Sequence, residues 1–146
     1  MDSNNPVVKL CAEGMQAEMQ GRPADARAAY LRAWAARRDA FEACLAAHYV
    51  ARHQDTPEEA RRWNAEALAQ ADAVGDDRVR GFYASLYLNM GHSCEVLGDV
   101  AGAVRYYELA EARLADAPEG PYGDVVRHGV AEGRRRVAAG LTSNVP

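Results

Sequence analysis

The sequence lacks the features that usually mark secreted, membrane-spanning or disulfide-bonded proteins. It has three cysteines, Cys11, Cys44 and Cys94, and no closely spaced cysteine pair. All three fall at apolar positions of expected helices, which predicts buried free thiols in a reducing compartment. No apolar run approaches the ~20 residues of a membrane span. The N-terminus also lacks a basic region followed by an apolar run, so we expect a cytoplasmic protein without a signal peptide and without a membrane contact.

Motifs of catalysis and of nucleotide binding are also missing. There is no GxxxxGK[ST] or GxGxxG element and no glycine-flanked nucleophilic serine. His48 and His53 are five residues apart, which places them on different sides of a helix, and the paired short-range ligands of a zinc site are absent. The sequence therefore predicts that the protein is not an enzyme and holds no metal and no cofactor.

The charge distribution argues against nucleic acid as a partner. The formal net charge of −4 gives no general attraction for a phosphate backbone. The segment Arg134–Arg136 is the most basic part of the chain. We interpret it as a cationic last helical turn that complements the helix dipole and keeps one face soluble, rather than as a nucleic-acid patch.

Helical periodicity is the main positive signal. About half of the 146 residues are apolar and a quarter are charged, as is typical of closely packed helices in one domain. Apolar spacing and helix-breaking residues predict seven helices, over residues 7–20, 24–38, 40–53, 57–74, 78–97, 100–115 and 122–139. Residues 1–6 and 140–146 are expected to be a flexible start and tail, with Gly140 ending the last helix.

Local signals fix several of these ends. Pro23 and Pro57 fall where a first helical turn tolerates proline. Thr56 and Glu59 have the spacing of a capping box at the start of the fourth helix. The first helix has the apolar residues Val8, Cys11, Ala12, Met15 and Met19 at helical spacing. The second is expected to bury Ala26, Ala29, Tyr30 and Ala33.

The stretch from Tyr83 to Leu114 carries the clearest motif. It has an aromatic residue, then Leu88 and Gly91, then Gly98-Asp99, and later Ala103, Tyr107 and Ala110. These residues resemble a tetratricopeptide repeat. Ala26 and Ala60 are 34 residues apart, which matches the period of that family. Ala60 and Ala103 are 43 apart, so nine extra residues are expected around the turn at 75–77.

The resemblance extends over residues 8–114 and implies the fold. It implies an all-α, right-handed superhelical stack of antiparallel helix hairpins. The three units cover about residues 7–38, 40–74 and 78–115, within a domain of residues 7–139. Helix 122–139 is expected to cap the apolar end of the stack. Within the third unit we expect Gly91 to face Ala103, and we expect Gly129 and Gly133 to bring the last helix close to the sixth.

The resemblance also implies a function, because the first helix of each tetratricopeptide hairpin lines a groove that holds a peptide or a partner helix. We expect a protein–protein or protein–peptide interaction module. The implied groove residues are Met15, Glu18, Met19, Tyr49, Arg52, His53, Leu88, Asn89, His92 and Glu95. A carboxylate clamp of the kind found in chaperone-tail binders is not present at these positions. Leu88 is equally well interpreted as core. Two alternatives stay open: a sensor domain for a short peptide or small ligand, and a self-association module forming a homodimer.

Overall fold

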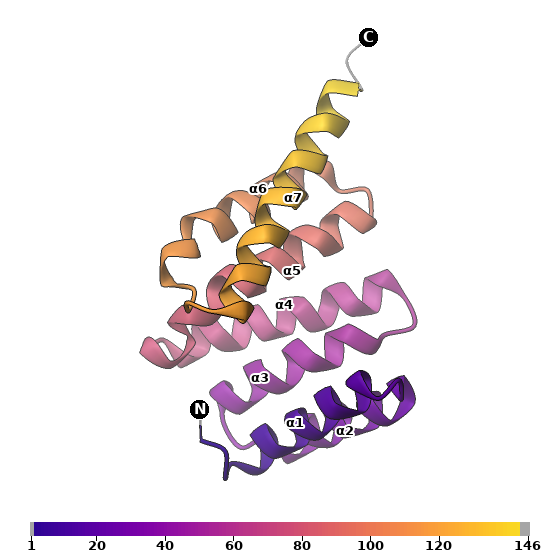
Figure 1. The fold of residues 1–146 in the computed structure, drawn as a ribbon, viewed down its shortest axis with the longest axis vertical. Coiled ribbons are helices and arrows are strands. Elements are labelled where there is room, and N and C mark those ends of the chain that lie inside the picture. The colour runs from indigo at the N-terminus through magenta and orange to yellow at the C-terminus, as the bar shows by residue number, and fades with distance from the viewer. Residues whose placement is uncertain (1, 144–146) are drawn as a thin grey trace. The chain divides into compact units, whose positions relative to one another are not determined.

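The computed structural model describes residues 2–143, with side chains up to residue 140. This part of the chain is all-helical and contains no strand, which confirms the predicted fold class (Figure 1). None of the described helices is long and apolar enough to span a membrane. The seven α-helices are α1 (Pro6–Met19), α2 (Pro23–Ala36), α3 (Ala40–Val50), α4 (Pro57–Val74), α5 (Tyr83–Val96), α6 (Val100–Ala112) and α7 (Pro121–Ser143).

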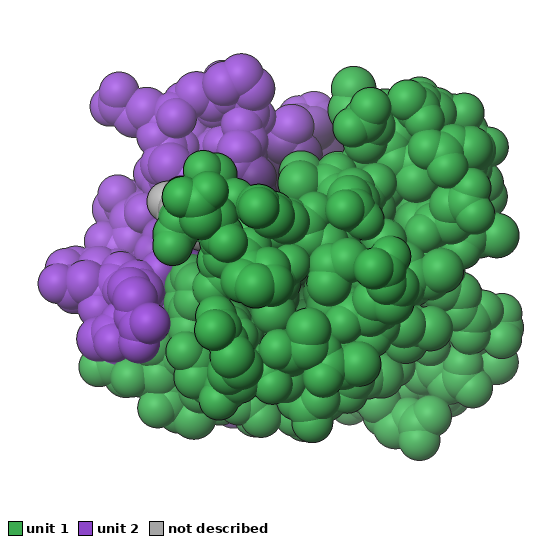
Figure 2. Space-filling model, turned by 90° about the horizontal axis from the view of Figure 1, so that it is seen from below, with its two compact units in different colours: residues 1–75 green, residues 76–146 purple. Residues whose placement is uncertain are grey.

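The chain forms two compact units, which Figure 2 colours green and purple. Unit 1 is residues 1–75, and unit 2 is residues 76–146. In unit 1, α1 packs on α2, α2 packs on α3, and α3 packs on α4. In unit 2, α5 and α6 form a hairpin, and α7 packs on both of them. Each unit therefore has an apolar core of its own.

Most helix ends are where the sequence placed them. The hydroxyl of Thr56 accepts a hydrogen bond from the Glu59 amide at 3.1 Å, and Pro57 takes the first helical position. Gly21 and Gly98 follow α1 and α5 with φ of 71° and 80°, a conformation that glycine adopts without steric cost. The same local chemistry therefore closes the first helix of each unit.

Four helix ends differ from the prediction. Short 3-10 turns at Ala51–His53, Asp77–Phe82 and Leu114–Asp116 replace α-helical turns that the apolar spacing had suggested. Gly140 does not end α7, which continues to Ser143. Gly140 keeps a helical backbone instead of the positive φ that terminates a helix, at a cost of up to ~1 kcal/mol relative to alanine. Of the segments predicted to be flexible, residues 1 and 144–146 lie outside the described residues.

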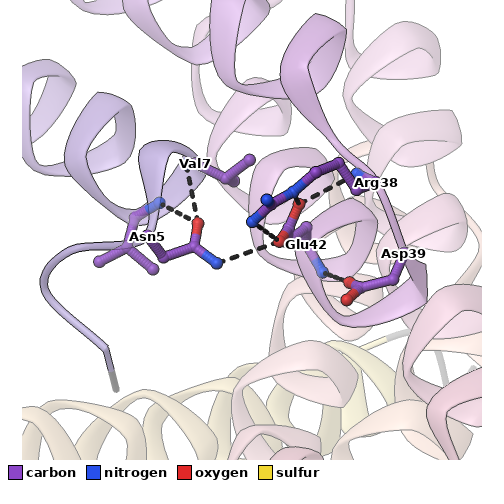
Figure 3. Close-up of polar contacts among 6 residues, drawn as sticks. Asn5, Val7, Arg38, Asp39 and Glu42 are labelled. Carbon is purple, nitrogen blue, oxygen red and sulfur yellow. Dashed lines mark hydrogen bonds and ion pairs between the residues drawn. The ribbon is translucent and has the colours of Figure 1, made fainter.

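The start of the chain is tied to the third helix by a buried carboxylate. Glu42 is only 3% exposed. It accepts hydrogen bonds from the Asn5 side chain at 3.0 Å and from Nη2 of Arg38 at 2.9 Å (Figure 3). Asn5 also caps α1 through the amides of Val7 and Val8. The hydrogen bonds from Arg38 are the main reason that the pKa of Glu42 is lowered. Residues 2–5 therefore form a turn that holds α1 against α3.

The two units repeat one arrangement of residues at a fixed offset. Residues of α1 and α2 match residues of α5 and α6 that lie 77 positions later. The matching pairs are Val7 with Ala84, Cys11 with Leu88, Gly14 with Gly91, Ala17 with Cys94, Glu18 with Glu95, Ala26 with Ala103, Tyr30 with Tyr107 and Ala33 with Ala110. Members of these pairs occupy equivalent places in the core clusters of the two units. The first hairpin of each unit is therefore built in the same way.

The third helix of each unit continues the match at an offset of 84. Ala46 and Val130 are both buried in the first core cluster of their unit, and Leu45 and Gly129 both lie next to the first helix. Arg52 and Arg136 both reach the glutamate on the first helix. In its packing against the first hairpin, α7 of unit 2 therefore corresponds to α3 of unit 1.

The apolar residues that indicated α1 by their spacing do not all lie on its buried face. Val7, Cys11, Gly14 and Ala17 are buried, whereas Ala12 is exposed, Met15 is 41% exposed and Met19 is 88% exposed. The reason is Gly14, because the ring of Tyr30 occupies the space that a Cβ there would fill. The prediction for α2 is confirmed, since Ala26, Ala29, Tyr30 and Ala33 are all buried. The cysteines are buried and free, as expected.

The close approach in the α5–α6 hairpin also has a different partner from the expected one. A Cβ on Gly91 would lie 2.7 Å from the ring of Tyr107, so that ring and not Ala103 fills the space. On α7, Gly133 meets Tyr107 of α6 as predicted, but Gly129 meets Leu88 of α5. Each of these glycines therefore packs against a large side chain, whereas the prediction placed Gly91 opposite another small residue, Ala103.

This packing predicts that Gly91→Ala destabilises unit 2. The added methyl group would overlap the buried Tyr107 ring, which has no room to move. We expect the free energy of unfolding to fall by ~1–3 kcal/mol, measured by chemical denaturation.

The matched control is Gly140→Ala in α7, where an added Cβ would meet no atom of the described residues within 4 Å. It should be neutral or stabilising by up to ~1 kcal/mol, because alanine favours the helix. Equal losses in the two variants would show that the Gly91–Tyr107 contact is not what limits the packing.

Candidate functional site

In unit 1 the structure brings together four of the predicted groove residues around Tyr30. Glu18 of α1 bonds to Arg52 and His53, which follow α3, and Tyr49 of α3 stacks on Tyr30. Met15 and Met19 lie on the same helix as Glu18 and are exposed. The predicted residues of unit 1 therefore form one cluster with two exposed methionines beside it along α1.

Glu18 is the centre of that cluster. Its Oε1 accepts a hydrogen bond from the Tyr30 hydroxyl at 2.5 Å and lies 2.9 Å from Nε2 of His53. Its Oε2 accepts from Nη2 of Arg52 at 2.7 Å. Burial alone would raise the pKa of Glu18, but the hydrogen bonds from Tyr30 and His53 and the charge of Arg52 outweigh it and lower the pKa. Both oxygens of the Glu18 carboxylate therefore already have hydrogen-bond partners within unit 1.

Tyr49 contributes to the core as well as to the surface. It is half-buried, its ring lies 5.1 Å from that of Tyr30 with an interplanar angle of 26°, and it packs against both core clusters of unit 1. Removing this ring would cost stability directly. Tyr49 is therefore a poor probe for binding, because its loss would change the fold and any binding surface at the same time.

Unit 2 has the same arrangement around Glu95. The Tyr107 hydroxyl donates to Oε1 of Glu95 at 2.6 Å, and Nε of Arg136 donates to Oε2 at 2.9 Å. These contacts, with the Arg136 bond as the largest cause, lower the pKa of Glu95. We call the two sets, Glu18–Tyr30–Arg52 and Glu95–Tyr107–Arg136, the carboxylate latches. In each unit the latch joins the first hairpin to the helical segment that follows it.

An open pocket lies between α5 and α7 of unit 2, beside the second latch. Its volume is about 460 Å³, and its lining residues are Leu88, Asn89, His92, Tyr107, His128, Gly129, Glu132 and Arg136. Three of these, Leu88, Asn89 and His92, were predicted to line a groove. The four residues from α7 were not, because the sequence pattern identified that helix only as a cap. We call this site the α5–α7 pocket.

Glycine on α7 forms one wall of the pocket. The residue of unit 1 that corresponds to Gly129 is Leu45, which is buried in the first core cluster. At Gly129 there is no side chain, and the backbone approaches Leu88 so closely that a Cβ would lie 2.9 Å from it. The pocket is therefore bounded by bare backbone on α7 and by an aliphatic side chain on α5.

The charged groups of the pocket are neutralised in pairs. Arg136 is bound to Glu95, and Glu132 accepts from Nη2 of Arg135 at 2.7 Å. The hydrogen bonds from Arg135 are the main reason that the pKa of Glu132 is lowered. His92 and His128 are exposed, and neither imidazole makes a hydrogen bond to another described residue. The pocket thus offers two imidazoles with open hydrogen-bonding capacity.

A second open pocket, of about 390 Å³, lies between α1 and α2 in unit 1. Its floor is formed by alanines, and its rim carries Glu13, Arg22, Asp25 and Arg32. Its charged rim residues pair with one another, Arg22 with Asp25 at 2.7 Å and Arg32 with Glu13. We therefore take the α5–α7 pocket, with its two exposed imidazoles, as the candidate site.

The side chains of the α5–α7 pocket can form hydrogen bonds and apolar contacts. In residues 2–143 no three His, Cys, Asp or Glu side chains are grouped closely enough to hold a metal ion. Burial raises the pKa of the Cys11 and Cys44 thiols to about 12, which makes them unreactive. Imidazole and amide groups above an aliphatic floor are suited to hydrogen bonding and apolar contact with a bound molecule.

Comparison of the chain with protein-family models, with curated proteins and with solved structures found no match.

The latches predict how stability responds to acid. Because the folded state lowers the pKa of Glu95, the latch contributes stability above the unfolded value near 4.5 and loses it as the pH falls through the folded pKa. Glu95→Gln should reduce the free energy of unfolding at pH 7 by ~1–3 kcal/mol. The difference from the wild type should shrink below about pH 4, as measured by urea denaturation at several pH values.

The matched control is Glu108→Gln, at an exposed position of α6 outside the latch. It should change stability by less than ~0.5 kcal/mol at every pH. A Glu95→Gln variant as stable as the control at pH 7 would show that the latch contributes nothing.

Proposed function

We propose that this chain is a tetratricopeptide-like interaction module that binds an extended peptide segment of a partner protein. The observation that carries the proposal is the α5–α7 pocket, where two exposed imidazoles without hydrogen bonds stand above Leu88 and the bare backbone of Gly129. A peptide offers both the hydrogen-bonding groups and the apolar side chains that such a site can use.

The packing within each unit supports the family assignment. The residues on which the resemblance rests have matching roles in both units. Gly14 and Gly91 accept the tyrosine rings, Gly21 and Gly98 turn the chain, and Ala26 and Ala103 are fully buried. These are the small-and-large contacts that a helix hairpin needs for close packing. That the hairpins continue into a right-handed superhelix remains a prediction of the resemblance.

The exposed side of α7 supports its proposed role as a cap. On α3, the residues Ala43, Cys44, Ala47 and Val50 are buried. Their counterparts on α7, at an offset of 84, are Arg127, His128, Ala131 and Arg134, and none of these is buried. Repeat arrays need a terminal helix with a polar outer face. The polar side of α7 meets that need, while the side that faces α5 is left to line the pocket.

The size of the pocket is also compatible with a second candidate function, the binding of a small molecule. About 460 Å³ lies within the ~300–1,000 Å³ range of small-molecule sites. A sensor domain that binds a small ligand in the same pocket is therefore the alternative. The peptide proposal is favoured because the pocket is open and its polar groups lie at exposed positions.

Selection of peptides from a displayed random library on the full chain tests this proposal. We expect selected peptides whose affinity falls at least ~30-fold in the double variant His92→Ala/His128→Ala. Both side chains are exposed, so the variant should keep the stability of the wild type. Calorimetric titration and urea denaturation measure the two quantities.

The control variant is Met19→Ala, at the most exposed of the predicted groove residues of unit 1. It should bind the selected peptides like the wild type. Peptides that lose affinity with Met19→Ala, but not with the double histidine variant, would move the site to unit 1. The absence of any selected peptide would contradict the proposed function.

A further inference from the structure

We infer that the α5–α7 pocket selects an uncharged aromatic side chain with a polar tip, namely a tyrosine of the bound peptide. This inference rests on the proposed function and specifies which chemistry the site recognises. It excludes acidic and phosphorylated side chains as the group that enters the pocket. Four features of the molecule support it: the charge of the pocket, its hydrogen-bonding groups, its apolar surface, and the residues at the equivalent positions of unit 1.

The charge of the pocket excludes an ionic anchor. Each charged lining residue already has a partner of opposite sign, Arg136 with Glu95 and Glu132 with Arg135. An anionic side chain would have to compete with Glu95 for the guanidinium, and a cationic one with Arg135 for Glu132. The Glu95 side chain is only 26% exposed, so a ligand that took Arg136 from it would leave a partly buried carboxylate without its cation. A ligand that took Glu132 from the exposed Arg135 would gain little, because exposed ion pairs contribute little. A neutral group avoids both competitions.

The hydrogen-bonding groups of the pocket suit a hydroxyl. A neutral imidazole carries one donor and one acceptor nitrogen, and a phenolic hydroxyl both donates and accepts. His92 comes from α5 and His128 from α7, so the two imidazoles stand on opposite sides of the opening. A single hydroxyl can use either of them, whereas an aliphatic side chain can use neither.

The apolar part of the pocket suits a ring. Leu88 is half-buried and packs against both core clusters of unit 2, so its position is fixed. The backbone of Gly129 lies directly against Leu88, where a Cβ would be 2.9 Å from the leucine side chain, and both residues line the pocket. A planar ring gains contact on both surfaces with little loss of conformational entropy, which is why tyrosine is common among interface anchors.

Unit 1 provides an internal precedent for an aromatic ring on this side of the third helix. The counterparts of Gly129 and Gly133 there are Leu45 and Tyr49, and Tyr49 packs against both core clusters. Unit 2 lacks both side chains. In unit 2 the space beside these two glycines is filled by Leu88 of α5 and by the ring of Tyr107, so a bound ring would contact these two side chains.

Titration of the full chain with blocked amino acids tests this inference. The probes are N-acetyl-tyrosinamide, N-acetyl-phenylalaninamide, N-acetyl-aspartamide with a free side-chain carboxylate, and N-acetyl-phosphotyrosinamide. The ring signals of His92 and His128 are followed by NMR at pH 8. We expect the tyrosine probe to bind most tightly and the phenylalanine probe to bind about 3–10-fold more weakly, because it lacks the hydroxyl. Both acidic probes should bind more weakly than the tyrosine probe.

Two variants place the binding in the pocket. Gly129→Ala pushes a methyl group towards Leu88 and should weaken the tyrosine probe at least tenfold. Gly140→Ala makes the same change on the same helix with no atom within 4 Å, and it should bind the probe like the wild type.

Tighter binding of either acidic probe would overturn the inference, and so would the lack of any shift with the tyrosine probe. Neither outcome touches the proposed function, which fails if no peptide is selected from the library. Equal affinities of the tyrosine and phenylalanine probes would also contradict the inference, since they would show that the hydroxyl has no partner in the pocket.

Discussion

The structure of each unit depends on one contact, a tyrosine ring held against a glycine with its hydroxyl on a carboxylate. Tyr30 and Tyr107 are fully buried, and each fills the space that a Cβ on Gly14 or Gly91 would occupy. A buried hydroxyl without a partner would be costly. A glutamate four residues after the glycine supplies that partner, so the ring and its polar tip fix the hairpin together.

The same contact decides which groups remain for function. Each glutamate needs a cation, and the segment after the hairpin provides it as Arg52 or Arg136. The latches therefore pair charged groups that the sequence predicted to line a groove, namely Glu18, Arg52 and Glu95. The groups that remain available to a ligand are imidazoles and apolar surface. In unit 2, these groups line the α5–α7 pocket, together with Gly129 of α7. We propose that a peptide side chain binds in this pocket, against Leu88 and Tyr107.

Local patterns predicted much of the fold, because its determinants are local. Capping by Thr56, the turns at Gly21 and Gly98, and the buried face of α2 all follow from residues within one or two helical turns. The buried face of α1 was missed because Gly14 has no apolar side chain to enter the periodic pattern. Its importance appears only with the tyrosine sixteen residues later. The pairing of Glu18 with Arg52, and of Glu95 with Arg136, spans 34 and 41 residues and leaves no local signal. For the same reason the contribution of α7 to the pocket was not foreseen.

A pair of double-mutant cycles tests the central claim, which is that both units are held by the same latch. The cycles combine Tyr30→Phe with Glu18→Gln, and Tyr107→Phe with Glu95→Gln, in the full chain at pH 7. The account predicts coupling energies of the same sign and similar size in the two units, about 0.5–3 kcal/mol, as expected for residues in direct contact. A coupling energy near zero in either unit would show that its tyrosine and glutamate act independently, and the common latch would be contradicted.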